Sequence, residues 1–405
     1  MTIRNMTIRN NILQLLMLSP YLFAFSGMLI IPSGDKKMAI FLVIGALASL
    51  AYSKVNKIEI KEQLFRPYLY ILIVAALYTI FSYYTHGASS REMRMLIASS
   101  IFLAACPIMD TNKKLLAYLL LIGSLTLFFN SFNYHFLIGY HRFTGYINPI
   151  PYATICALIA STAYSIILSS SNIKEKLVCV FTLLIVSYPL ITSESRGVWL
   201  ALALSLLIIS AIHIKDTKKE AVRLTIRILI LFSIVSFGSL VLLKGSIIET
   251  VKKTKFEISQ IESGEFNNSI GLRLQMWLVA PKLVKDNLFF GNGDYHQLKV
   301  KQLYSRGEAP YSLYNFNPTH YHNQFLDKLI KSGIIGFIIL SLVMIYPISI
   351  SNHLSKREKM IVWGVFTVIF VASMSDVPLN HPQPLIVYLL ILFPILSRYK
   401  RVTND

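Results

Sequence analysis

The sequence is poor in cysteine and in charged residues. Its three cysteines, Cys106, Cys156 and Cys179, all fall inside apolar runs of the 405-residue chain. This placement excludes a disulfide framework and a CxxC site, so we interpret them as small core residues. Charged residues make up 15% of the chain and hydrophobic residues 54%, and the mean hydropathy is +0.57. This composition excludes an ordinary soluble globular protein.

Sequence signatures of metal sites are also absent. The sequence contains no HExxH motif and no Asp-x-Asp pair that would hold a divalent ion. His320 and His322 stand two residues apart, but no further ligand accompanies them in a recognised spacing. We therefore predict that neither a metal nor another cofactor takes part.

The net charge of +19 at pH 7 arises from 39 Lys and Arg against 20 Asp and Glu. No basic helix or aromatic platform of the kind that binds nucleic acid is present, so we predict no such partner. The basic residues lie instead in short segments between apolar runs. The segments that we assign to the inner side hold 21 of the 39 basic residues and 8 of the 20 acidic ones. The positive-inside rule therefore predicts that both chain ends are cytoplasmic.

Apolar runs of membrane-spanning length recur along nearly the whole chain. The first run has no small-residue cleavage site behind it, so we interpret it as a retained helix and not as a signal peptide. No internal repeat and no low-complexity tract is present. The pattern predicts an all-α polytopic membrane protein with about twelve transmembrane helices, at 11–32, 38–53, 67–84, 93–109, 115–132, 150–170, 177–192, 197–212, 226–243, 330–350, 360–375 and 382–397.

One long polar segment interrupts this pattern between the ninth and tenth spans. It divides the chain into transmembrane helices 1–9 (residues 1–243), an outer loop domain (244–323) and transmembrane helices 10–12 (324–405). Because this segment is the longest polar stretch on the outer side, we expect it to contribute to a functional site.

The outer loop has recognisable local structure. A helix is predicted from Ile270 to Asp286 by the i, i+3, i+4 spacing of Leu274, Trp277 and Leu278. A turn is predicted at Gly291-Asn292-Gly293-Asp294. Residues 303–318 are rich in Tyr, Asn and Pro, and they predict an irregular flap.

Three arginines fall on three separate outer connections. Arg142 precedes a Gly-x-x-Asn-Pro turn, Arg196 begins one span just after another ends, and Arg273 begins the loop helix. A guanidinium matches a diphosphate with its fork of donors better than an ammonium does. The alternative interpretations are an interfacial arginine that contacts lipid headgroups and a solvated helix charge. Together the three are compatible with one anionic site.

His322 is the candidate general base. It lies close to the start of an apolar helix, and the positive end of the helix dipole disfavours an imidazolium. The ring would therefore stay neutral and ready to accept a proton. The alternatives are a loop histidine that is hydrogen-bonded to the backbone, and His320 as the base in its place.

Taken together, these strings resemble the bacterial O-antigen ligase family, within the O-antigen ligase and polymerase superfamily. They occur in the family's order over about the second two-thirds of the chain, whereas the first five spans carry no matching motif. The strings are Arg142-x-x-Gly145-x-x-Asn148-Pro149, Ser195-Arg196-Gly197-Val198-Trp199-Leu200, Arg273-x-x-x-Trp277, Phe290-Gly291-Asn292-Gly293, and His322-Asn323 followed by Gly333 and Gly336.

The resemblance implies a GT-C-like enzyme of the bacterial inner membrane with a periplasmic loop and active site. Its donor would be an undecaprenyl-diphosphate-linked O-antigen, its acceptor lipid A-core, and its reaction metal-independent and inverting. By similarity, His322 would deprotonate the acceptor, while Arg196 and Arg273 would bind the diphosphate. The resemblance also places four residues at the substrate: Arg142, Asn148, Asn323 and Trp277. After Ser375-Asp376 the chain departs from related members, which carry a basic residue nearby, so no role is assigned to His381.

Two other functions are open alternatives. An O-antigen polymerase uses the same donor but joins repeat units to one another, and the single large loop and the pattern Leu272-Arg273-Leu274-x-Met276 favour the ligase. A lipid-linked sugar transporter is a distant alternative. Transporters commonly have internal repeats and polar residues at the bilayer midplane, and this sequence has almost no charge there.

Overall fold

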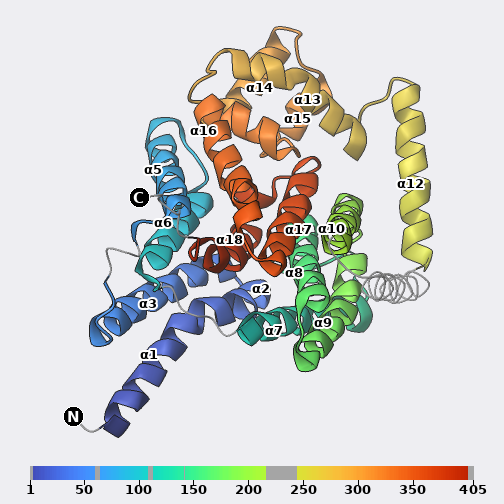
Figure 1. Cartoon of the computed structure of the whole chain (residues 1–405). Coiled ribbons are helices and arrows are strands. Elements are labelled where there is room, and N and C mark those ends of the chain that lie inside the picture. Colours follow the sequence, from blue (N-terminus) through green and yellow to red (C-terminus); the bar gives the residue numbers. More distant parts are fainter. Residues whose placement is uncertain (1–2, 60–63, 108–112, 141, 216–243, 400–405) are drawn as a thin grey trace.

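The computed structural model describes residues 3–59, 64–107, 113–140, 142–215 and 244–399, and within these ranges it contains helices and no strand (Figure 1). The apolar runs form the main bundle: α1 (Ile3–Ala24), α2 (Gly27–Ile30), α3 (Gly34–Val55), α5 (Pro67–His86), α6 (Ser90–Ala105), α7 (Lys113–Phe132), α8 (Pro149–Ser169), α9 (Ile173–Thr192), α10 (Arg196–Ile214), α16 (Gln324–Ser349), α17 (Lys356–Ser373) and α18 (Pro382–Leu396).

Eight helical segments in the described part of the chain are long and apolar enough to cross a membrane. The prediction of an all-α polytopic membrane protein is therefore confirmed. The predicted span at 226–243 lies outside the described residues. The total of twelve spans and the placement of the loop outside the membrane stay predictions.

Helix α8 is the centre of the bundle, and every residue from Pro151 to Leu168 is buried. Hydroxyl groups join it to its neighbours: Ser161 lies 2.7 Å from Ser205 of α10, and Ser205 donates to the carbonyl of Gly364 in α17 at 3.0 Å. Small residues and interhelical hydrogen bonds are the contacts that hold membrane helices together, because apolar surface gains little by leaving lipid.

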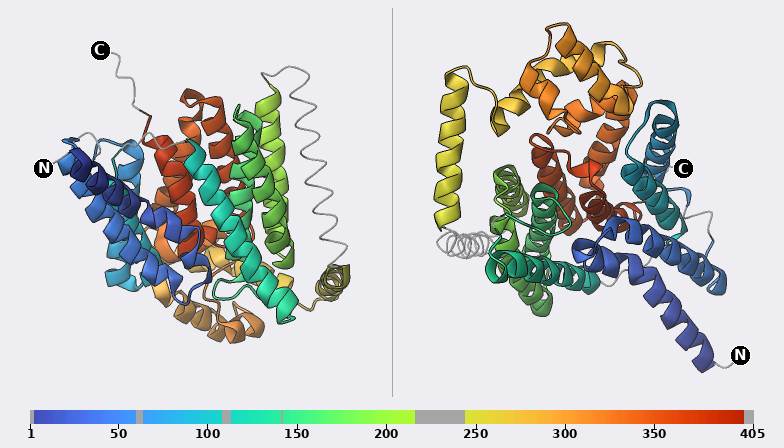
Figure 2. Two further views of the ribbon diagram at one scale, coloured as in Figure 1. Left: turned by 90° about the horizontal axis from the view of Figure 1, so that it is seen from below. Right: turned by 180° about the vertical axis from the view of Figure 1, so that it is seen from behind.

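The polar segment after the gap at 216–243 forms α12 (Lys244–Glu262), α13 (Ser269–Lys285), α14 (His296–Ser305) and α15 (Tyr311–Phe316). Helices α13 to α15 lie across one end of the bundle (Figures 1 and 2) and enclose a hydrophobic core of their own, which includes Met276, Leu283, Val300, Leu313 and Tyr321. The helix predicted at 270–286 is confirmed. The irregular flap predicted at 303–318 is wrong in part, because α14 continues to Ser305 and α15 supplies the buried Leu313.

Helix α12 runs in a different direction from the bundle. In the left view of Figure 2 it is seen end-on near the end covered by α13 to α15, whereas the bundle helices run along the picture. It bears exposed apolar side chains at Ile248, Val251 and Ile258, and its Glu257 is buried. The carboxylate of Glu257 accepts hydrogen bonds from the Ser269 hydroxyl at 3.0 and 3.1 Å, which ties α12 to the start of α13.

Two predicted spans are interrupted. The first divides into α1 and α2 around Phe25 and Ser26. The tenth begins at Gln324, earlier than predicted, and its helical geometry breaks at Gly333 (φ 63°, ψ −168°). The cause of the second break is a close approach: a Cβ on Gly333 would lie 2.3 Å from the carbonyl oxygen of Phe289, and one on Gly291 2.4 Å from the amide nitrogen of Gly333. Only glycine fits both places.

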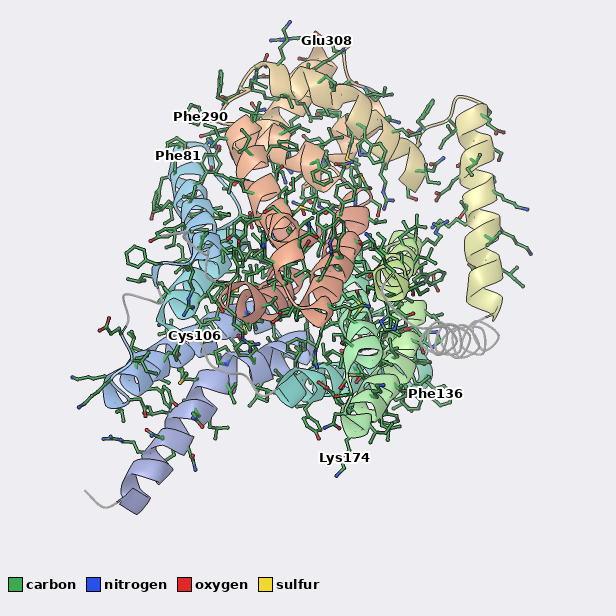
Figure 3. The ribbon with its side chains drawn as sticks, in the orientation of Figure 1. Phe81, Cys106, Phe136, Lys174, Phe290 and Glu308 are labelled. Carbon is green, nitrogen blue, oxygen red and sulfur yellow. The ribbon has the colours of Figure 1, made fainter. Side chains whose placement is uncertain are left out.

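The segment 288–292 takes up the backbone groups that this break frees. The amide of Ile334 donates to the carbonyl of Leu288 at 2.8 Å, and the amide of Asn292 donates to that of Ile330 at 2.8 Å. Phe290 also packs on Phe81 of α5, with ring centroids 5.5 Å apart, and Figure 3 labels both side chains. The loop is therefore fixed to the bundle at the kink of α16.

Candidate functional site

The residues singled out by the sequence come from connections at the end of the bundle where α8, α10, α16 and α18 begin and α17 ends. Four non-glycine residues on these connections have a left-handed backbone: Arg142 (φ 55°), Glu194 (φ 52°), Asn317 (φ 44°) and His322 (φ 48°). Such conformations cost about 1–2 kcal/mol each, and they persist where the surrounding structure enforces them, as at functional sites.

His322 is paired with a carboxylate that lies 54 positions away in the sequence. Its Nδ1 is 3.2 Å from Oδ1 of Asp376, on the connection between α17 and α18. His320 reaches the same oxygen through Nε2 at 3.5 Å, and the two imidazole rings make an edge contact with centroids 4.3 Å apart. Asp376 is only 2% exposed. Both histidines are therefore oriented by one buried carboxylate.

The charge state of Asp376 determines the tautomer of His322. Burial raises the pKa of this carboxyl, but the hydrogen bonds to His320 and His322 outweigh burial and leave the pKa below its usual range. An ionised carboxylate only accepts hydrogen bonds, so a neutral His322 must carry its proton on Nδ1. Nε2 then holds the lone pair and is the nitrogen that can accept a proton.

Tyr321 holds the backbone just before His322. Its side chain is fully buried. Its amide donates to Oδ1 of Asp327 at 3.2 Å, its carbonyl accepts from the indole of Trp277 at 3.0 Å, and its hydroxyl lies 2.9 Å from Nδ1 of His296. Burial lowers the pKa of His296 to about 3, so this ring is neutral where it shares a hydrogen bond with the tyrosine hydroxyl. Three hydrogen bonds thus position the residue that precedes the candidate base.

A second set of hydrogen bonds fixes the Asp376 connection against α16. Gln324 Nε2 donates to Oδ1 of Asn380 at 2.7 Å, and Asn380 Nδ2 donates to Oδ2 of Asp327 at 2.6 Å. The backbone amide of Leu379 donates to Oε1 of Gln324 at 2.9 Å. The segment after Asp376 is therefore hydrogen-bonded to the first turn of α16, which follows His322, and these bonds help to hold the two residues together.

The three arginines act on one another electrostatically. The pKa of Arg273 is lowered from its ordinary value, first by burial and then by the positive charges of Arg142 and Arg196, while Asp376 and Glu257 oppose the shift. The guanidinium of Arg196 also donates to the hydroxyl of Thr254 in α12. Arg142, Arg196 and the carboxylate of Asp376 thus all act on the guanidinium of Arg273, and a group of positive charges of this kind is suited to an anion.

Gly197 explains how Arg196 comes so close to the Asp376 connection. A Cβ at this position would lie 2.4 Å from the hydroxyl of Ser375, so a larger residue would push the start of α10 away. The Ser-Arg-Gly string therefore has a packing reason as well as a chemical one.

Two of the predicted substrate-binding residues already have structural bonds. Trp277 donates its indole proton to the carbonyl of Tyr321. Asn323 caps α16, because its Oδ1 accepts from the amides of Phe325 at 3.0 Å and Leu326 at 3.1 Å. Asn148 differs: it precedes α8 without capping it through its side chain, and it lines a cavity. Arg142 is exposed. The substrate roles of all four stay predictions.

The cavity that Asn148 lines has a volume of about 410 Å³ and lies beside His320. His320 is part of its wall, and its other side chains are largely polar, among them Arg91, Asp294, Asn380 and Gln383. Lys328 of α16, which also lines it, forms an ion pair with Glu92 of α6. A cavity of this size with many donors and acceptors is suited to a sugar.

The histidines and Asp376 also meet the distance condition for a metal site, since one ligand atom from each lies within 4.8 Å of the others. The fit depends on the nitrogen that His322 would use: a metal on Nδ1 would displace the proton donated to Asp376, whereas a metal on Nε2 would leave that bond intact and would occupy the lone pair of the candidate base. The cluster therefore supports either a proton acceptor or a metal ion at His322, and the two exclude each other.

Sequence reasoning did not identify Asp376 as the partner of His322. Asp376 had only been noted beside a departure from the family's pattern. A buried acid directly after an apolar run was the available signal, because an ionised group in such a place needs a partner.

Residues 181–341 match the family model described as O-Antigen ligase. This segment contains Arg196, Arg273 and His322, whereas Arg142 and Asp376 lie outside it. The chain is also 28% identical over 188 residues to an uncharacterised protein of Haemophilus influenzae, a match that covers 44% of this chain and 45% of that protein. Through residues 181–341, which carry the candidate base and two of the three arginines, the chain is similar to the O-antigen ligase family.

Proposed function

We propose that this protein is a glycosyltransferase that moves an undecaprenyl-diphosphate-linked O-antigen polysaccharide onto lipid A-core. It would do so as an O-antigen ligase of GT-C-like architecture, at the periplasmic face of the bacterial inner membrane. The family match at residues 181–341 supports transfer from a lipid-linked polysaccharide. The contact between His322 and Asp376, within reach of the charges of three arginines, is the observation that carries the proposal.

The reaction needs a base for the acceptor hydroxyl and positive charge to stabilise the departing diphosphate. Nε2 of His322 takes the proton of the acceptor hydroxyl, whose oxygen attacks the anomeric carbon of the donor sugar. The bond from that carbon to the diphosphate oxygen breaks, and its electron pair leaves with undecaprenyl diphosphate. Arg196 and Arg273 offset the charge that develops on the diphosphate, with Arg142 beside them. A single displacement of this kind inverts the anomeric carbon.

We assign the acceptor sugar to the 410 Å³ cavity beside His320. Its polar wall, including Asn148, Asn380 and Gln383, offers hydrogen bonds to sugar hydroxyls. The arginines then serve the donor and the cavity serves the acceptor, and His322 lies between the two binding regions.

A transfer assay with purified protein, lipid-linked donor, lipid A-core and excess EDTA tests the proposal. We expect transfer to persist in EDTA and to fall at least about 10²-fold in His322→Ala, the usual scale for losing a general base. His353→Ala is the matched control, because His353 lies between α16 and α17 at the other end of the bundle. It should transfer normally.

Other outcomes of this assay would each contradict one part of the proposed function. Full transfer by His322→Ala with loss in His320→Ala would move the base to His320. Loss in EDTA with recovery on adding a divalent ion would assign the histidines and Asp376 to a metal. Longer polymer on the lipid carrier, with none on lipid A-core, would identify a polymerase.

A further inference from the structure

A second and larger cavity, of about 960 Å³, lies at the opposite ends of the same helices. It is lined where α6, α8, α10 and α18 end and where α5, α7, α9 and α17 begin. Cys106, labelled in Figure 3, is one of its wall residues. Nothing in the proposed transfer reaction uses this cavity.

The length of the helices separates the cavity from the candidate site. Asn148 stands at the start of α8 and Ser170 at its end, and the 21 residues of α8 span about 30 Å at 1.5 Å per residue. This equals the thickness of the hydrocarbon core. The cavity therefore opens near the other leaflet, the cytoplasmic one if the proposed orientation holds.

The charge of the cavity wall is positive. Among the described wall residues there are four cationic side chains from Lys and Arg and two carboxylates. Arg357 is paired with Glu175 at 2.7 Å, and Arg398 lies 3.8 Å from Glu358. The remaining two, Arg66 and Lys356, have no carboxylate within ion-pair distance among the described residues. Lys356 donates to the carbonyl of His213 at 2.9 Å, and an anion in the cavity would balance the two charges.

Arg66 is a buried cation with unused donor capacity. It is only 4% exposed, and its guanidinium donates to the carbonyls of Leu103 at 3.3 Å and Cys106 at 3.1 Å. Its Nε has no hydrogen-bond partner in the part of the chain that the structure describes. A buried N–H without a partner is costly, and a ligand oxygen in the cavity would satisfy it.

The wall also has an apolar part. Leu116, Leu119, Leu390 and Ile391 line the cavity next to the cations. A cavity between membrane helices with a basic mouth and an apolar interior matches a phospholipid. The basic mouth would bind the phosphate and the apolar interior would hold the acyl chains. A nucleotide or another soluble anion would leave the apolar part without a partner.

We propose that this cavity binds an anionic phospholipid of the leaflet opposite the transfer site. The phosphate lies between Arg66 and Lys356, and an acyl chain extends along Leu119 and Leu390. This inference concerns a different end of the molecule, so it does not rest on the proposed function.

Delipidated protein in dodecyl maltoside tests the proposal with three probes: phosphatidylglycerol, phosphatidylcholine with the same acyl chains, and glycerol 3-phosphate. Apparent affinities follow from the thermal unfolding midpoint against probe concentration. We expect phosphatidylglycerol alone to raise the midpoint. Lys356→Gln should weaken its binding about fivefold, the factor for one basic group at an anionic-lipid site.

Lys359→Gln is the matched control: Lys359 lies on the same helix, bonds to Asn352 at 2.8 Å and does not line the cavity. Its affinity should equal that of the parent protein. Leu119→Trp should abolish binding by filling the cavity without changing any charge. Equal responses to phosphatidylcholine, to glycerol 3-phosphate, or in the two lysine variants would each overturn the proposal.

Discussion

At the scale of single residues, Asp376 decides which nitrogen of His322 is available. A carboxylate that stays ionised while buried accepts a hydrogen bond from Nδ1–H and leaves Nε2 as the base. His320 shares the same oxygen, so it helps to hold the carboxylate in place. The chemistry of the histidine therefore depends on a residue that supplies no atom to the reaction.

Asp376→Asn should lower kcat and kcat/KM together by about 10³–10⁴-fold, the scale seen when a catalytic histidine loses its tautomer. The change keeps the shape of the side chain and removes its charge, so the KM for donor should change little. Steady-state transfer kinetics measure this split. Asp286→Asn is the control, because Asp286 is exposed and pairs with Lys299 away from the histidines. A kcat near that of the parent would show that Asp376 does not orient the base.

Trp277 and Asn323 illustrate how one side chain can serve two roles. Both belong to strings that resemble a family's motifs. Both also hold the backbone around His322, Trp277 through a hydrogen bond to Tyr321 and Asn323 through hydrogen bonds to the first turn of α16. Loss of either would displace the candidate base, whether or not the residue touches substrate. Removing a cap such as Asn323 costs roughly 1 kcal/mol.

At the scale of elements, the break in α16 at Gly333 is the place where the segment after α13 attaches to the bundle. The part from Gln324 to Ser332 carries the bonds that hold Asn380 and Tyr321, and the part after Gly333 forms the apolar span. The segment 288–292 fits into the break and uses the freed backbone groups. The position of α13 to α15 therefore influences the position of His320 and His322 through this kink.

Gly333→Ala should destabilise the protein and reduce transfer, because the new Cβ would meet the carbonyl of Phe289 at 2.3 Å in a backbone conformation that suits only glycine. We expect a loss of about 2–4 kcal/mol from strain and contact together, read as a lower thermal midpoint. Gly307→Ala is the control: its φ is also positive (72°), but no atom lies within 4 Å of the added Cβ. Equal midpoints for the two variants would show that the contact with Phe289 is unimportant.

At the scale of the whole molecule, the two ends of the helix bundle present different sets of charged residues. The end with His322, Arg196 and Arg273 is covered by α13 to α15 (Figure 1). The other end holds Arg66, Lys356 and Arg357 around the larger cavity. From the positive-inside rule we predict that the second end is cytoplasmic and that the proposed transfer site is periplasmic.

Cysteine labelling in intact cells tests this orientation. In a background without Cys106, Cys156 and Cys179, a membrane-impermeant maleimide should label Glu308→Cys directly and Lys174→Cys only after permeabilisation. Both residues are exposed, and they project from opposite parts of the molecule in Figure 3. The reverse labelling pattern would place the histidine pair in the cytosol and remove the basis of the proposed transfer.

The sequence alone determined the helical class and the membrane setting, and it singled out several of the candidate side chains. Hydropathy is a sum over about 20 neighbouring residues, so it predicts where an apolar helix forms without reference to any other helix. The helix around Trp277 was predicted for a similar reason, since i, i+4 spacing is local, whereas the start of α16 lies earlier than the predicted one.

Only the tertiary structure decided which of these residues meet. Asp376 reaches His322 across 54 positions, and Gly333 breaks its helix because Gly291 arrives from another segment. Arg66 and Lys356 come to one cavity from helices far apart in the chain. These contacts depend on how helices pack, which follows from the joint fit of many side chains and not from any single stretch of sequence.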